Sequence, residues 1–106
     1  MSIKLFCLEN GKTPAVQHTF PVNISREETV GDLKDAIKAK KAPYFNDFPA
    51  DHLKLWLANI PVDRDDLIQN QTLQDNNQLP ATNDIEDHWT DTPLKKHIHI
   101  IVEVPI

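Results

Sequence analysis

The ten residues HLKLWLANIP, 52–61, contain the pattern on which the fold prediction depends, because side chains alternate in character from Leu53 to Ala58. In a β-strand, successive side chains point to opposite faces of the sheet. The two faces are therefore Leu53, Leu55 and Leu57 on one side and Lys54, Trp56 and Ala58 on the other. The leucines predict a strand packed on a core. The other face places one of the chain's two tryptophans beside a lysine, which needs an explanation.

Two more strands are predicted before this one. Residues 3–8 (IKLFCL) form the first, and residues 16–24 (VQHTFPVNI) form a strand that returns from it. The residues on the inner face of the returning strand are Phe20, Val22 and Ile24. The Asn10-Gly11 pair between the strands favours a tight hairpin turn. Because Pro21 has no N–H for a ladder hydrogen bond, we expect the returning strand at an edge of the sheet.

One helix is predicted between the second and third strands. Its N-cap is either Ser25 with Glu28 or Thr29 with Asp32, and we favour Thr29 because an apolar stripe then begins in the first turn. The stripe consists of Val30, Leu33, Ala36 and Ile37. Lysines near the other end suit the negative end of the helix dipole, and Pro43 ends the helix. These lysines are Lys38, Lys40 and Lys41.

The rest of the chain is a long polar segment followed by a last strand. Residues 59–96 are rich in Asn, Asp and Gln, and we expect Trp89 to attach this segment to the body of the domain. Residues 97–104 (HIHIIVEV) form the last strand. Its inward residues are predicted to be Ile98, Ile100, Val102 and Val104. The order of elements predicts one α+β domain over residues 1–106: a β-grasp fold with a mixed sheet of four or five strands, one main helix and a long loop before the last strand.

Composition excludes several classes of function. The net charge is −5, with 11 Lys and Arg against 16 Asp and Glu and no basic run, which argues against direct nucleic-acid binding. No apolar stretch approaches the roughly 18 residues of a membrane span, and no conventional signal peptide is readable at the N-terminus. A single cysteine, Cys7, excludes an intramolecular disulfide, and its apolar neighbours indicate a buried thiol rather than a nucleophile.

The order and spacing of the elements resemble ubiquitin-like domains over most of the chain. The strand 3–7, the NGK turn at 10–12 and the helix start TVGDLKDAI at 29–37 carry this resemblance. The segment 59–96 is longer than its counterpart in ubiquitin. A conjugatable modifier also needs a Gly-Gly tail, and the chain ends VEVPI with neither of its two glycines nearby. The resemblance therefore implies a domain that is not conjugated.

A more specific resemblance covers the whole chain: it is similar to the N-terminal header of Crinkler effectors. The residues that carry it are Leu5, Cys7 and Gly11, the helix 29–40 (TVGDLKDAIKAK), LWLAN at 55–59 in the place of the family's LFLAK signature, and HIHIIVEVP at 97–105. Trp56 replaces the signature Phe and Asn59 replaces the signature Lys. A direct role of that lysine is therefore in doubt here.

The resemblance implies a non-catalytic header of a secreted effector. Such headers are associated with delivery into host cells, where a fused C-terminal domain acts in the cytoplasm or nucleus. The runner-up hypothesis is an intracellular ubiquitin-like adaptor that docks regulatory partners without being secreted. Detection of the native protein outside the producing cell discriminates between the two.

The face that carries Trp56 is the candidate interaction site. With the last strand lying between the first and third, Phe6, Trp56, His99 and Ile101 become neighbours in an apolar patch. The candidate site residues are Phe6, Lys54, Trp56, Ala58, Asn59, His99 and Ile101. The patch is predicted to bind a host or effector protein or a second copy in a homodimer. In the alternative, the segment 59–96 folds back and covers Trp56.

Other chemistry has weak support in the sequence. His88, His97 and His99 are candidates for a metal site, but no motif completes the ligand set, and a pH-sensitive interface at His99 is a milder alternative. The carboxylates of 63–66 and 83–88 fall in expected loops with no adjacent nucleophile. We therefore predict no catalytic residues, no metal and no cofactor.

Overall fold

The structure, a computed structural model, describes residues 2–10, 15–42, 49–64, 66, 78–90, 93 and 95–103. Its strands are β1 (Ser2–Glu9), β2 (Phe20–Ser25), β3 (Lys54–Pro61) and β4 (His97–Glu103). Its helices are α1 (Ala15–His18) and α2 (Val30–Lys40), with 3-10 turns η1 (Ala50–His52) and η3 (Ile85–Asp87). The predicted α+β class with one main helix is confirmed. The expected helix stop at Pro43 and the inward Val104 lie outside the described residues.

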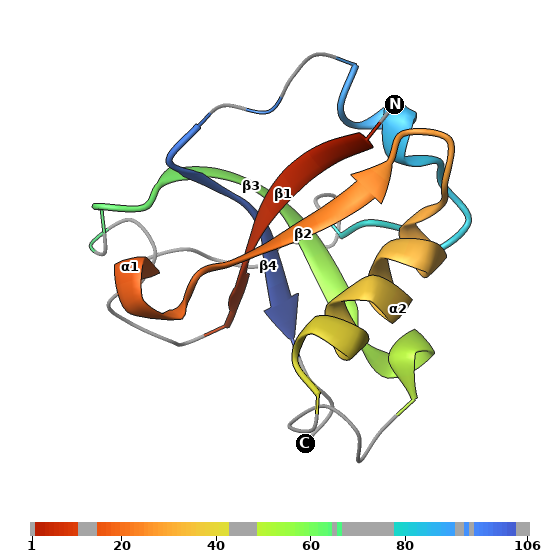
Figure 1. Cartoon of the computed structure of the whole chain (residues 1–106), viewed down its shortest axis with the longest axis horizontal. Coiled ribbons are helices and arrows are strands. Elements are labelled where there is room, and N and C mark those ends of the chain that lie inside the picture. Colours follow the sequence, from red (N-terminus) through yellow and green to blue (C-terminus); the bar gives the residue numbers. More distant parts are fainter. Residues whose placement is uncertain are drawn as a thin grey trace.

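The four strands form one mixed sheet in the order β2-β1-β4-β3 (Figure 1). β1 pairs antiparallel with β2 and parallel with β4, and β3 pairs antiparallel with β4. The last strand therefore lies between the first and the third, as predicted. β2 is an edge strand, as Pro21 required. Pro21 lies opposite Phe6, and the Phe6 N–H points away from β2, to the His99 side chain. This is therefore a non-hydrogen-bonded pair of the ladder, in which an N–H at position 21 would have no partner on β1.

The connection between β1 and β2 differs from the predicted tight turn. The ladder between these strands ends at the Cys7–Phe20 pair, and the helical turn α1 lies between them (Figure 1). Part of the sequence expected to extend β2 is therefore helical. Gly11 itself lies outside the described residues. The Asn10 N–H donates to the Val102 carbonyl at 2.7 Å, so Asn10 continues the contact of β1 with β4 instead of turning back.

Helix α2 begins at the predicted cap. Thr29 Oγ1 accepts from the Asp32 N–H at 3.2 Å, and Asp32 Oδ2 accepts from the Thr29 N–H at 3.1 Å, which is a capping box. The predicted apolar stripe packs on the sheet, with Val30, Leu33 and Ile37 fully buried and Ala36 partly buried.

The main core lies between α2 and one face of the sheet. It collects the inward residues of all four strands together with the apolar stripe of α2. From the strands these are Ile3, Leu5, Cys7, Phe20, Val22, Ile24, Leu55, Ile100 and Val102. Ile98 does not join them. Ile98 is fully buried in a second cluster with Trp56 and Ile101, and the β3–β4 register shifts between the Leu57–Ile100 pair and the Ile60–Ile98 pair.

The long segment before β4 is part of the fold. The N–H groups of Val30 and Gly31, at the open end of α2, donate to the carbonyls of Asn83 (2.9 Å) and Ala81 (3.1 Å). These bonds satisfy donors that a helix N-terminus leaves without intrahelical partners. Leu79, Ile85 and Trp89 from the same segment are buried in the main core. The prediction that Trp89 attaches the segment to the body is confirmed.

Candidate functional site

Trp56 is buried, with 5% of its surface exposed, so the expectation of an exposed indole on the outer face of the sheet is wrong. The segment that follows Ala58 contributes to this burial, because Ile60 and Val62 pack against the cluster that contains Trp56. Gln78 forms an isolated antiparallel bridge with Trp56, and the Leu79 N–H donates to the Leu55 carbonyl at 2.8 Å. The alternative, in which the long segment folds back over Trp56, is the one that the structure supports.

A second apolar cluster surrounds Trp56 on the face of the sheet away from α2. It consists of Leu8, Trp56, Ile98 and Ile101, with Ala58, Ile60 and Val62 packed against it. We call this cluster the tryptophan half of that face. Trp56 and Ile101 are direct cross-strand partners, as predicted. The indole Nε1 is buried and has no hydrogen-bond partner among the described residues.

The LWLAN strand presents a mixed surface. Lys54 and Asn59 are exposed, Leu57 and Ala58 are half-buried, and Leu55 is fully buried. The candidate contact surface on this strand is therefore polar at its two ends and partly apolar between them. The Trp56 side chain is buried and contributes little to this surface.

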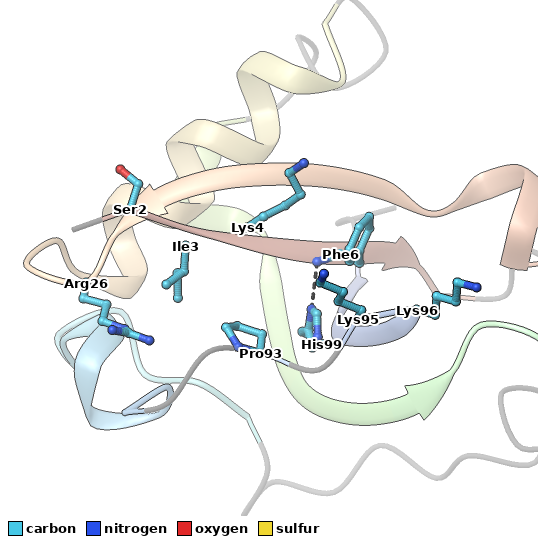
Figure 2. A pocket seen from close by; sticks show the side chains of 9 residues that line it. All are labelled: Ser2, Ile3, Lys4, Phe6, Arg26, Pro93, Lys95, Lys96 and His99. Carbon is cyan, nitrogen blue, oxygen red and sulfur yellow. Dashed lines mark hydrogen bonds between the residues drawn. The ribbon is translucent and has the colours of Figure 1, made fainter.

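Phe6 and His99 form the other part of the predicted patch. Their ring centroids are 5.9 Å apart, and the Phe6 N–H donates to His99 Nδ1 at 3.0 Å (Figure 2). His99 is 4% exposed and Phe6 is half-buried. Together with Lys4 they form what we call the pocket half of the face. The four aromatic and apolar residues predicted as one patch thus divide into two places, Phe6 with His99 and Trp56 with Ile101.

A pocket of about 490 Å³ adjoins Phe6 and His99. Its basic lining includes Lys4, Arg26, Lys95 and Lys96. The sequence-based reasoning missed this cluster. Arg26 and Lys95 lie far apart in the chain, and only the return of the long segment to the sheet brings them together (Figure 2).

The three histidines proposed as metal ligands are not gathered. His88 Nε2 lies 3.2 Å from Asn83 Nδ2, His97 Nδ1 lies 2.8 Å from the Lys95 carbonyl oxygen, and His99 faces Phe6. Among the residues that the structure describes, no group of three His, Cys, Asp or Glu side chains is arranged to hold a metal ion.

Cys7 is a buried thiol, as predicted. It is fully buried in the main core, and burial raises the pKa of its thiol far above the ordinary value of 9.0. A nucleophilic cysteine needs a lowered pKa and an accessible sulfur atom. Cys7 therefore has the environment of a packing residue.

The acidic residues near the helix ends and in the loops have local structural tasks. Asp32 caps α2, the Asp87 carboxylate accepts from the Asp84 N–H at 3.0 Å at the start of η3, and Asp66 pairs with Arg64 at 2.9 Å on the surface. In the described part of the chain, no helix is both long enough and apolar enough to cross a membrane.

Comparison with known proteins gives the family. Residues 3–103 match the model of the Crinkler effector protein N-terminal domain. The chain is 41% identical over 105 residues to Crinkler effector protein 1 of Rhizophagus irregularis, covering 99% of this chain and 22% of that protein. It is 31% identical over 122 residues to Crinkler effector protein 8 of Phytophthora infestans, covering 97% of this chain and 19% of that protein. The chain thus spans about a fifth of the length of these relatives. It belongs to the Crinkler effector family, whose N-terminal domain it matches over nearly its whole length.

Proposed function

We propose that this chain is a non-catalytic header of a secreted effector, which serves delivery into host cells and protein–protein interaction. The observation that carries this proposal is the family match over residues 3–103. In the two relatives described above, about four fifths of the length lies outside the matched region, which leaves room for a separate effector domain in those proteins. We extend that modular architecture to this protein.

The topology supports a ubiquitin-like β-grasp fold. An antiparallel β1–β2 pair precedes the single main helix, and β4 returns to the centre of the sheet parallel to β1. This order is the one expected from the resemblance to ubiquitin-like domains. We propose that residues 1–106 form one such domain, with the signature at 55–59 on an edge strand.

Surface features of β3 support its role in interaction. β3 is an edge strand whose outer side meets residues 78 and 79 at Trp56 and Leu55, so another chain would pair with its later part, toward Asn59. Lys54 and Asn59 are exposed on this strand, and Ala58 is half-buried between them. We propose that this strand contacts a second copy in a two-fold dimer, or a host or effector protein. In this proposal the buried pair of Trp56 and Ile101 holds β3 on β4, and Phe6 and His99 lie further along the same face of the sheet.

Analytical ultracentrifugation of Asn59→Glu and Asn23→Glu tests the role of the strand. Both asparagines are exposed, and they lie on β3 and β2, the two opposite edges of the sheet. A charge near a two-fold axis meets its own copy, so Asn59→Glu is expected to raise the dimer dissociation constant by about tenfold, whereas Asn23→Glu leaves it unchanged. A wild-type chain that stays monomeric at high concentration refutes self-association. Equal effects of the two variants refute the assignment to β3.

Delivery needs a separate test. A reporter enzyme fused after residue 106 and expressed in the producing cell is expected to appear first in the medium and then inside host cells. Retention of the fusion in the producing cell refutes delivery and supports the runner-up function, an intracellular adaptor. A fusion that carries Asn59→Glu shows whether delivery depends on the LWLAN strand.

A further inference from the structure

The pocket beside Phe6 and His99 lies where β1 and β4 separate. Pairing between these parallel strands begins at Cys7 and Ile100 and continues toward Glu9. On the earlier side of Cys7, the pocket of about 490 Å³ lies between β1 and the residues that lead into β4 (Figure 2). Its lining residues are Ser2, Ile3, Lys4, Phe6, Arg26, Pro93, Lys95, Lys96 and His99. A volume of this size accommodates a small ligand or a few residues of a peptide.

The charge of this pocket is opposite to the charge of the chain. Among the residues that the structure describes, nine line the pocket; four of these are Lys or Arg and none is Asp or Glu, whereas the chain as a whole has a net charge of −5. The four cationic side chains come from β1, from the turn after β2 and from the approach to β4. Four cations along one pocket create a local positive potential that favours an anionic ligand.

Arg26 contributes a second observation. Its Nε is buried and has no hydrogen-bond partner among the described residues. A buried donor without a partner carries a desolvation cost. Figure 2 shows the guanidinium at one end of the pocket, with Lys96 at the other. A carboxylate at this end would pair with the guanidinium charge.

Part of the pocket wall is apolar. Ile3, Phe6 and Pro93 line it together with the His99 ring, which lies 5.9 Å from the Phe6 ring. A small inorganic anion would leave these surfaces without contacts. The ligand that fits therefore combines acidic groups with an apolar side chain.

The backbone groups of β1 indicate which kind of acidic ligand fits the pocket. The N–H groups of Phe6 and Asn10 point toward β4, because they donate to His99 Nδ1 and to the Val102 carbonyl. Since backbone groups alternate along a strand, those of Lys4 point to the same side, where β4 no longer pairs. At Phe6 a histidine side chain occupies the place of a neighbouring strand. An extended peptide is the ligand whose backbone can pair at such an edge.

We propose that this pocket binds an extended acidic peptide segment of a partner protein, with carboxylates at Lys4, Arg26 and Lys95 and one apolar side chain against Phe6. The backbone of the peptide pairs with β1 at Lys4. This site is separate from the LWLAN strand, so it can fail while the proposed function stands. It does not require self-association.

Fluorescence anisotropy with a labelled peptide, Glu-Thr-Glu-Thr-Phe-Thr-Glu, whose acidic and apolar side chains share one face of an extended chain, tests the proposal on the whole chain. Two control peptides replace every Glu by Gln or every apolar residue by Ser. Lys4→Glu/Lys95→Glu reverses two exposed charges of the pocket, and Lys38→Glu/Lys40→Glu makes the same change on α2, away from it. The pocket variant is expected to weaken binding by about tenfold or more, and the α2 variant to leave it unchanged.

A separate set of methylated peptides tests the backbone contact. Methylating the backbone nitrogens of alternate peptide residues, in both phases, should abolish binding in one phase only, because an extended peptide pairs along one edge. Equal binding of the Gln peptide refutes the charge recognition, and equal binding of the Ser peptide refutes the apolar contact. Equal loss in the two charge variants refutes the location. Tolerance of methylation in both phases refutes the strand pairing.

Discussion

The face of the sheet away from α2 has two halves, which arise from the same alternation of side chains but reach opposite states. In the tryptophan half, Trp56, Leu8 and Ile101 form a buried cluster. In the pocket half, Phe6 and His99 line a pocket with a cationic rim. The difference follows from how the long segment meets this face: Ile60 and Val62 pack against the cluster of Trp56, whereas Lys95 and Lys96 line a pocket beside Phe6. Alternation decides which face a residue occupies, but the rest of the chain decides whether that face is covered.

The largest expected effect is the difference in the free energy of unfolding between truncations in the two halves. Trp56→Ala removes a large side chain that is 5% exposed and is expected to lower the free energy of unfolding by about 3–5 kcal/mol. Phe6→Ala, at a half-buried position, is expected to cost about 1–2 kcal/mol. Urea denaturation measures both, with Lys54→Ala as the exposed control on the strand of Trp56. Equal losses at Trp56 and Lys54 would show that Trp56 is open to solvent.

Most of the architecture could be predicted from the sequence, because it depends on local patterns. The Thr29 cap, the stripe of α2, the edge position of β2 and the central position of β4 follow from capping, periodicity and proline chemistry. The turn after β1 could not, since the Asn10-Gly11 pair favours a hairpin only when the strands extend to it. The covering of Trp56 could not either, because residues 59–96 show no periodicity that specifies where they return.

Cys7 tests the boundary between the halves. It lies where β1 begins to pair with β4, and its thiol pKa is raised by burial above the ordinary 9.0. Because the folded state disfavours the thiolate, its contribution to stability is complete below pH 9.0 and declines as the unfolded thiol ionises above that pH. By pH 10 the loss is expected to reach about 1.4 kcal/mol.

The control for this prediction is Cys7→Ala, whose free energy of unfolding should lack that part of the alkaline slope. Iodoacetamide should also fail to modify the native thiol at pH 8 and should modify it in urea. Rapid modification of the native chain would mean that the separation of β1 and β4 at the pocket extends past Cys7. The boundary would then lie further along both strands.

Lys96, which lines the pocket, has a strained backbone conformation. It has a φ of 58°, in the left-handed region that L-residues adopt at a cost and glycine adopts freely. Lys96→Gly is expected to raise the free energy of unfolding by about 0.5–1 kcal/mol, since relief of strain exceeds the entropy added to the unfolded chain. Lys95→Gly is the control and should lower it. If both variants lower the free energy of unfolding equally, the backbone of Lys96 is not strained, and the shape of the pocket half has no cost in stability.

The smallest expected effect concerns the indole of Trp56. Its Nε1 is buried without a hydrogen-bond partner among the described residues, and such a donor costs about 1–3 kcal/mol. Trp56→Phe removes this cost and restores the aromatic residue of the LFLAK signature, but it also removes apolar contacts with Leu8 and Ile101. The two terms oppose each other, so thermal and urea unfolding should show a net change within about 0.5 kcal/mol. A loss close to that of Trp56→Ala would mean that the whole indole volume is needed. In that case the tryptophan half is packed for tryptophan specifically, and the pairing of Gln78 beside it depends on the larger ring.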